Sequence, residues 1–89
     1  MKHRVSFEGA AFEEFIAWAE KEASIHQKIV ALLRDIDRTP FTGLGKPEPL
    51  KYELQGYWSR RITQEHRLIY KVTQESIVVI SCKYHYLKV

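Results

Sequence analysis

The hydrophobic pattern of this chain changes its period near Pro40, and that change limits the folds available to it. Before this proline, apolar residues recur every three or four positions, as they do along one side of a helix. After it, short apolar runs alternate with polar residues between turn-forming sequences, as in strands. Helices followed by consecutive strands predict an α+β protein, with the helices on one face of a mostly antiparallel sheet.

The N-terminal half is predicted to contain one short strand and two helices. Residues 3–7 alternate in polarity and favour a first strand. Helical stripes run through residues 8–21 and then through residues 25–38. Between them, Ser24 and Gln27 have the spacing of a capping box, in which each side chain bonds the other residue's backbone amide. The link is so short that the helices are predicted to form a hairpin.

The C-terminal half is predicted to begin with a loop and to continue as strands. Pro40 ends the second helix, and residues 42–49 contain two glycines and two prolines, which exclude a helix or a central strand. Long irregular segments of this kind are often functional. About four strands are predicted after it, at residues 50–54, 57–63, 67–72 and 77–86. No repeat or linker divides the chain, so residues 1–89 are predicted to form one domain.

Basic residues are concentrated in the second half of the chain. Residues 1–45 contain six Lys and Arg against seven Asp and Glu, whereas residues 46–89 contain eight against four. The net charge of +3 therefore comes from one half alone. An asymmetry of this kind favours contact with a polyanion.

Other features exclude several kinds of site and location. Cys82 is the only cysteine, so no internal disulfide can form, and its apolar neighbours indicate a buried small hydrophobe. The four histidines are scattered and no acidic cluster accompanies them, so neither a metal nor another cofactor is expected. The N-terminus has no apolar stretch suited to a signal peptide or a membrane span, which predicts a cytoplasmic protein.

The strand registers follow from matching the apolar faces of neighbouring strands. Positions 68, 70 and 72 are apolar, and so are positions 78, 80, 82 and 84 of the last run. Matching these two faces puts Tyr84 in the core. Matching Trp58 and Ile62 with Leu68 and Val72 in the same way puts Arg61 on the opposite face of the sheet. That face then gathers the basic side chains, which are Arg61, Arg67, Lys71, Lys83 and His85.

This basic face suits cleavage of RNA through the ribose 2′-hydroxyl without a metal. The reaction needs a base for the hydroxyl, cations for the charge on phosphorus and an acid for the leaving 5′-oxygen. Glu48, held between two prolines, is a candidate base. Arg61 and Arg67 can each form paired bonds to a phosphate. His85 can act as the acid near neutral pH.

Each of these residues also has an ordinary structural interpretation. Glu48 would be a solvated loop residue, the basic side chains a solvated sheet face, and His85 incidental. The strand pattern places Trp58 in the core, and Trp18 faces either the core or a partner. Tyr86 could stack on a base.

Five ordered sequence blocks resemble the YoeB/Txe branch of the RelE toxin superfamily. They are Arg38-Thr-Pro-Phe41, Gly43-Leu-Gly-Lys-Pro-Glu-Pro-Leu-Lys51, Gly56-Tyr-Trp-Ser-Arg-Arg-Ile-Thr63, Glu65-His-Arg-Leu-Ile-Tyr70 and Cys82-Lys-Tyr-His-Tyr86. The resemblance extends from the first strand to Tyr86 and implies the RelE-like microbial RNase fold. The one departure is that three residues follow Tyr86.

The resemblance implies a toxin of a type II toxin–antitoxin pair. Such toxins are ribosome-dependent mRNA endonucleases that cut in the ribosomal A site without a metal and so inhibit translation. By resemblance, Glu48 is the general base, Arg67 stabilises the phosphate charge and His85 is the general acid. Tyr86 orients the substrate or its neighbour.

The resemblance also implies supporting residues and partners. Lys51, Arg61 and Glu65 fall at positions that such toxins use around the active site or the RNA, and Lys71 and Lys83 add charge for RNA binding. The family forms homodimers and is neutralised by a Phd/YefM-type antitoxin whose C-terminal segment wraps the toxin.

Two other functions are also compatible with the sequence. ParE-like relatives of the same general fold inhibit DNA gyrase without being enzymes, although such binders lack the acid and base residues seen here. A basic RNA-binding module would bind free RNA in a salt-dependent way without cutting it.

Overall fold

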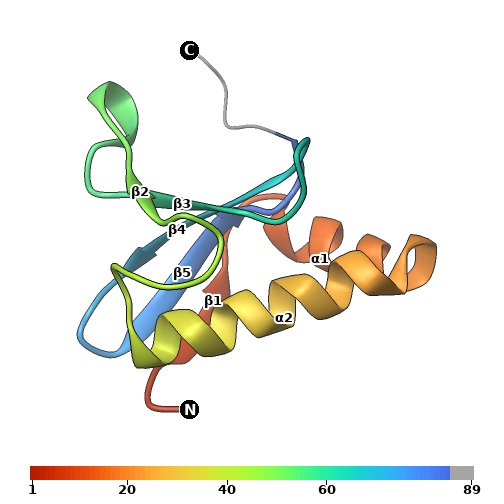
Figure 1. The fold of residues 1–89 in the computed structure, drawn as a ribbon, viewed down its shortest axis with the longest axis horizontal. Helices are drawn as coiled ribbons and strands as arrows, with labels where there is room; N and C mark the ends of the chain where they lie inside the picture. Colours follow the sequence, from red (N-terminus) through yellow and green to blue (C-terminus); the bar gives the residue numbers. More distant parts are fainter. Residues whose placement is uncertain (85–89) are drawn as a thin grey trace.

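The computed structural model contains the expected order of one strand, two helices and then further strands (Figure 1). It describes residues 1–84, so the predictions for His85 and Tyr86 lie outside the described residues. The elements are β1 (Arg4–Phe7), α1 (Ala11–Lys21), α2 (Ala23–Arg38), β2 (Glu48–Pro49), the 3-10 helix η1 (Tyr52–Leu54), β3 (Trp58–Arg61), β4 (Arg67–Val72) and β5 (Ser76–Ser81). The predicted α+β class is confirmed.

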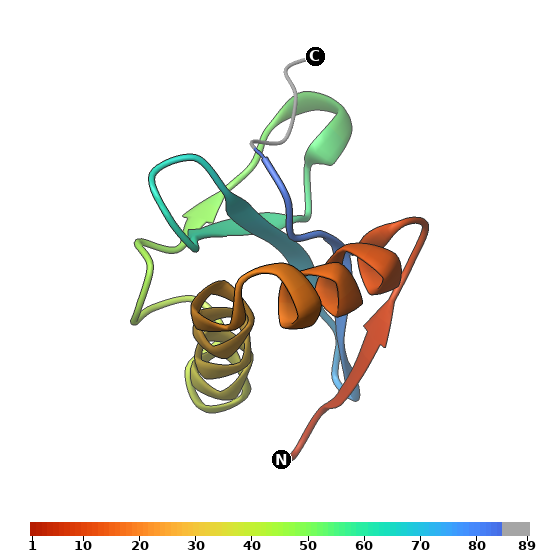
Figure 2. The same cartoon turned by 90° about the vertical axis from the view of Figure 1, so that its right-hand side faces the viewer.

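The strands form a five-stranded sheet in the order β1-β5-β4-β3-β2. β1 pairs in parallel with β5, and the other neighbours pair antiparallel. Both helices cover the same face of this sheet, as two perpendicular views show (Figures 1 and 2). The core lies between helices and sheet and includes Ile29, Leu32, Leu68 and Val79, all without solvent exposure. Within residues 1–84, no helix is long and apolar enough to cross a membrane.

The junction between the helices differs from the prediction. α2 begins at Ala23, and its N-cap is Glu22, which makes no side-chain capping bond. Ser24 and Gln27 lie inside the helix, so the predicted capping box is wrong. The reason is that Glu22 ends one helix and begins the next: its amide donates to Trp18 O, and its extended backbone turns the chain.

The predicted strand at residues 50–54 is also wrong. Pairing is confined to Glu48–Pro49 and to one further bond from the Leu50 amide to Tyr57 O. Proline cannot donate to a ladder and is therefore tolerated at the edge of a sheet, which is where β2 lies. Tyr52 then adopts a positive φ of 57°, which ends the extended conformation and starts η1.

The predicted register between β4 and β5 is correct only at the C-terminal end of β5. Val72 pairs with Ile77 and Tyr70 with Val79, one residue out of step with the prediction, so Val78 does not face the helices. An irregularity between Ile69 and Tyr70 then shifts the register by one residue, a β-bulge that the apolar pattern does not reveal. Beyond the bulge the predicted register holds, and Cys82 is buried in the core as predicted.

A charged side chain lies in the core beneath β3. Arg60 has no solvent exposure and shares the helix-facing side of the strand with Trp58. Its guanidinium donates to the Asp35 carboxylate of α2 at 2.6 Å and to the Tyr70 hydroxyl of β4 at 3.0 Å. Three backbone carbonyls complete its bonds, those of Thr39, Thr42 and Leu44 at 2.7, 2.9 and 3.1 Å.

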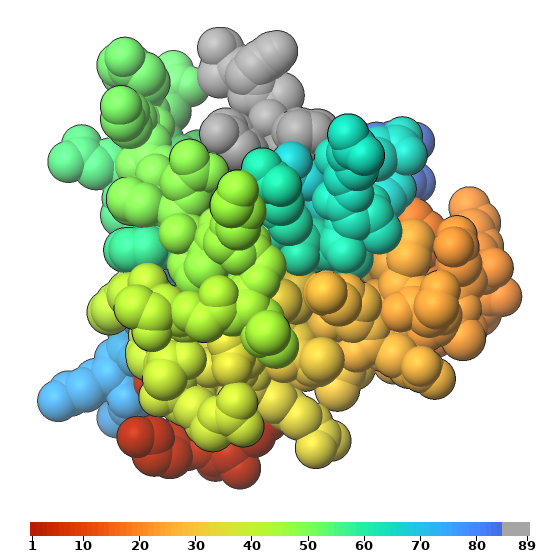
Figure 3. Space-filling model, in the orientation of Figure 1, coloured from red at the N-terminus to blue at the C-terminus, as the bar shows by residue number. Residues whose placement is uncertain are grey.

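These bonds shape the loop that leads to β2. The Leu44 amide donates to Asp35, and this bond and Arg60 hold the pKa of the Asp35 carboxyl below its ordinary value. Gly43 adopts a φ of 116°, and a Cβ at that position would overlap the Asp35 carboxylate. Gly45 O accepts from the Arg61 amide at 2.7 Å, which joins the loop to β3. The loop and the β3–β4 turn accordingly lie side by side on the surface (Figure 3).

We expect Arg60→Met to lower the free energy of unfolding by about 3–5 kcal/mol, because Asp35 and three carbonyls would lose a buried donor. The matched control is Arg61→Met on the same strand, whose side chain is exposed and which should change stability by less than about 0.5 kcal/mol. Urea unfolding followed by circular dichroism measures both. Equal midpoints for the two variants would contradict the role of Arg60.

Candidate active site

Three of the predicted site residues lie together on the sheet face opposite the helices, called here the free face. Glu48 pairs directly with Ser59, and Arg61 pairs directly with Arg67. Since Arg60 points into the core, Ser59 and Arg61 point the other way, and their cross-strand partners follow them. Directly opposed residues have Cβ atoms about 5 Å apart, and diagonal neighbours such as Glu48 and Arg61 about 7–8 Å apart.

The free face has a buried floor between these charged residues. Ser59 pairs with Ile69, and both are buried although neither faces the helices. Glu48 and Arg61 are exposed, and Arg67 is half-buried. The face is therefore less polar than predicted, with an apolar floor edged by one carboxylate and two guanidinium groups.

Arg67 is held in place by its own turn. Its Nη1 donates to the backbone carbonyls of Thr63, Gln64 and His66, at 2.8, 3.1 and 3.1 Å. Among residues 1–84, no partner accepts from its Nε or Nη2, the other two nitrogens of the guanidinium. A phosphate can therefore bind to the remaining edge of a guanidinium whose position is already fixed.

The arginine pair carries two like charges at directly opposed positions. Such pairs destabilise an antiparallel ladder unless an opposite charge compensates them. No carboxylate of the described residues forms a salt bridge with Arg61 or Arg67. The Arg61–Arg67 pair is therefore electrostatically suited to an external anion.

The remaining predicted RNA contacts are more widely spread. Lys71 lies on the free face of β4, with its Nζ 5.3 Å from the centre of the Tyr57 ring. Lys51 is exposed and follows β2. Glu65 is exposed in the β3–β4 turn, and its Oε1 lies 3.7 Å from His66 Nε2.

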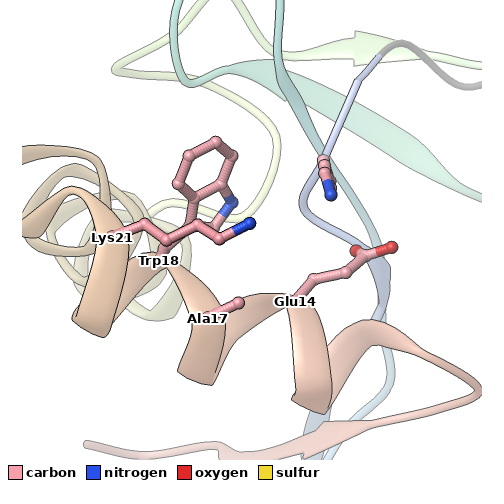
Figure 4. Close-up of a pocket in the computed structure, with 5 residues that line it drawn as sticks. Glu14, Ala17, Trp18 and Lys21 are labelled. Carbon is pink, nitrogen blue, oxygen red and sulfur yellow. The ribbon is translucent and has the colours of Figure 1, made fainter.

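Lys83 and Tyr84 do not lie where the register predicted. Lys83 lines a small pocket with α1 residues rather than joining the arginines, and Glu14, Trp18 and Lys21 border that pocket (Figure 4). Tyr84 is 55% exposed and has a φ of 58°, so its predicted place in the core is wrong. The physical reason is that β5 ends at Ser81 and the chain turns immediately afterwards.

His66 and Arg60 are buried polar residues that the sequence pattern did not predict. His66 is 8% exposed, and its Nδ1 accepts a hydrogen bond from the Tyr84 amide at 2.7 Å. The alternation of residues along β3 and β4 could have indicated their burial, because it puts even-numbered residues on the core side whether or not they are apolar. Cys82 is inert by comparison, because burial and the nearby Glu14 raise the pKa of its thiol to about 12.

A family model for the YoeB-like toxin of bacterial type II toxin–antitoxin systems matches residues 7–86. Toxin YoeB of Escherichia coli strain K12 is 51% identical over 76 residues, which cover 85% of this chain and 90% of that protein. Toxin YoeB of Streptomyces coelicolor is 47% identical over 83 residues, 93% of this chain and 99% of the relative.

Solved structures agree with the sequence relatives. The YoeB dimer from Staphylococcus aureus superposes with a TM-score of 0.91 at 44% identity, covering 97% of this chain and all of that one. A YoeB–YefM complex from the same species gives a TM-score of 0.89 with the same identity and coverage. YafQ from E. coli, at 19% identity and a TM-score of 0.73, shares the fold. The predicted RelE-like microbial RNase fold is confirmed, and the chain belongs to the YoeB-like toxins of bacterial type II toxin–antitoxin systems.

Proposed function

We propose that this chain is a ribosome-dependent mRNA endonuclease that works without a metal and thereby inhibits translation. The main support for this proposal is the directly opposed Arg61–Arg67 pair on the free face. Glu48 lies on the same face, opposite Ser59 and therefore in the neighbouring row of cross-strand residues. This arrangement offers a site for a phosphate beside a base. Membership of the YoeB-like toxins supports the choice of mRNA as the substrate.

The proposed reaction moves two protons. Glu48 takes the proton of the ribose 2′-hydroxyl, and the resulting oxygen attacks phosphorus. Arg67 and Arg61 donate hydrogen bonds to the non-bridging oxygens as negative charge develops on them. His85 gives a proton to the leaving 5′-oxygen, while Tyr86 orients the substrate. The products are a 2′,3′-cyclic phosphate and a 5′-hydroxyl, so the RNA supplies its own nucleophile.

The other charged residues are assigned to the RNA around the cut. Lys51 follows the strand of Glu48, and Lys71 lies on the strand of Arg67, so both flank the proposed phosphate site. Glu65, in the β3–β4 turn, and Lys83, beside α1, are assigned to the edge of the RNA path.

The partners of the S. aureus relative suggest partners for this chain. That YoeB protein has been solved as a dimer and in a complex with YefM. We infer that this chain forms a homodimer in the cytoplasm and is neutralised by an antitoxin of the Phd/YefM type.

Substitution of the three central residues tests the proposed chemistry. We expect Glu48→Gln, Arg67→Gln and His85→Gln each to lower mRNA cleavage on translating ribosomes by about 10²–10⁴-fold, because each removes one element of acid, base or charge stabilisation. The matched controls are Glu53→Gln and Arg4→Gln, which change exposed charges away from the Arg61–Arg67 pair and should leave cleavage unchanged. Primer extension on a reporter mRNA maps and quantifies the cuts.

The proposal fails if all three variants cut as well as the wild type. It fails equally if expression damages DNA while mRNA stays intact, since that result would indicate gyrase inhibition.

A second prediction concerns binding of RNA by the arginine pair. In the inactive Glu48→Gln background, Arg61→Gln should weaken binding of a single-stranded RNA oligonucleotide. It should also reduce the slope of log affinity against log salt by about 0.7, the value for one lost phosphate contact. Fluorescence anisotropy across a salt series measures this slope. Arg34→Gln, an exposed arginine of α2, is the control, and equal slopes for both variants would exclude a phosphate contact at Arg61.

A further inference from the structure

The segment after β5 is fixed to α1 through Cys82. The Cys82 amide donates to Glu14 Oε1 at 2.8 Å, and its carbonyl accepts from Trp18 Nε1 at 2.9 Å. Both backbone polar groups of this residue are therefore satisfied by side chains of one helix. These two bonds fix the direction in which the main chain leaves the sheet after β5.

Two residues later the same segment is fixed to the β3–β4 turn. The Tyr84 amide donates to His66 Nδ1 at 2.7 Å, and the Tyr84 carbonyl accepts from the Arg67 amide at 3.1 Å. Tyr84 adopts a φ of 58°, a left-handed conformation that is unfavourable for a non-glycine residue. Such a conformation persists where the surroundings over-determine the backbone, and these two bonds supply that constraint.

The hydrogen bond from the Tyr84 amide selects one tautomer of the His66 ring. The ring is buried, with its centre 4.8 Å from that of Trp18 and 5.3 Å from that of Tyr84. Because Nδ1 accepts a hydrogen bond, it carries no proton, so the ring proton lies on Nε2. That nitrogen is 3.7 Å from the Glu65 carboxylate. At Nδ1, His66 is therefore a hydrogen-bond acceptor.

The residue that follows Tyr84 is His85, the proposed general acid. The Tyr84 carbonyl, which belongs to the peptide bond between Tyr84 and His85, accepts from the backbone amide of Arg67, the proposed phosphate ligand. The proposed acid is therefore joined to a residue whose backbone is hydrogen-bonded to the backbone of Arg67.

We propose that His66 is a positioning residue for cleavage: its Nδ1 holds the backbone amide of Tyr84, the residue to which the proposed acid His85 is joined. This role rests on the proposed function. Among the described residues, the His66 ring makes no hydrogen bond or ion pair with Glu48 or with Nε and Nη2 of Arg67, so we expect it to act on the chemical step and not on RNA binding. Misplacement of a catalytic group by about 1 Å can cost about 10²-fold in rate.

Two substitutions separate the acceptor from the ring. His66→Asn keeps an acceptor at the δ position but loses the ring, whereas His66→Phe keeps a ring between Trp18 and Tyr84 but has no acceptor. We expect His66→Phe to lower kcat for cleavage on mRNA-programmed ribosomes by roughly 10–100-fold, with KM unchanged within about twofold. His66→Asn should retain kcat within about threefold of the wild type.

A second readout does not depend on activity. Amide hydrogen exchange of Tyr84, followed by ¹⁵N NMR, should be slow in the wild type and in His66→Asn and fast in His66→Phe. Thermal unfolding checks that each variant folds, and His66→Leu, which also lacks an acceptor, replaces His66→Phe if the latter does not fold.

Each failure has its own signature. If the wild type cuts mRNA and His66→Phe (or His66→Leu) cuts it equally well, the positioning role alone is overturned. Equal loss of kcat in His66→Asn and His66→Phe overturns it as well. Fast exchange of the Tyr84 amide in the wild type also overturns it. A wild-type chain that cuts no mRNA overturns the proposed function, and the positioning role falls with it.

Discussion

The buried ion pair between Arg60 and Asp35 determines much of what the rest of the molecule can do. A guanidinium without solvent exposure is tolerated in a small core only because a carboxylate, a phenol and three carbonyls accept its hydrogen bonds. Those acceptors come from α2, β4 and the loop that precedes β2. One side chain thus fixes helix, sheet and loop together, and Glu48 stands only a few residues beyond the loop carbonyls that it holds.

The alternation of a single strand separates stability from function. Arg60 points into the core, while its neighbour Arg61 points to the free face and lies opposite Arg67. The charge of Arg60 on the core side is compensated by Asp35, whereas the charges of Arg61 and Arg67 on the free face can be compensated by an external anion. Repulsion between Arg61 and Arg67 slightly lowers the stability of the fold, and it occurs at the site where the proposed substrate phosphate binds.

Apolar patterning predicted the parts of the molecule that depend on local rules. The faces of β3 and β4 were predicted correctly, and with them the placement of Arg61 and Arg67 on one side of the sheet. The register differs by two residues, because Trp58 lies opposite Tyr70 and not opposite Val72. The prediction failed at the β-bulge in β5, because an extra residue leaves no mark in the apolar alternation. The burial of Arg60 and His66 was not predicted because charged and polar residues are normally exposed. Their partners, Asp35 and the Tyr84 amide, are distant in sequence, and no local pattern connects them.

In the proposed reaction, the RNA supplies the nucleophile and this chain supplies the acid, the base and the cations. The most direct measurement uses an mRNA with a single 2′-deoxy nucleotide at a mapped cleavage position, presented on ribosomes with the purified chain. We expect the all-ribose mRNA to be cut to a 2′,3′-cyclic phosphate and a 5′-hydroxyl, and the 2′-deoxy substitution to abolish that cut while neighbouring sites remain cleavable. Cleavage of the substituted position at the normal rate, or products with a 5′-phosphate, would exclude the proposed reaction.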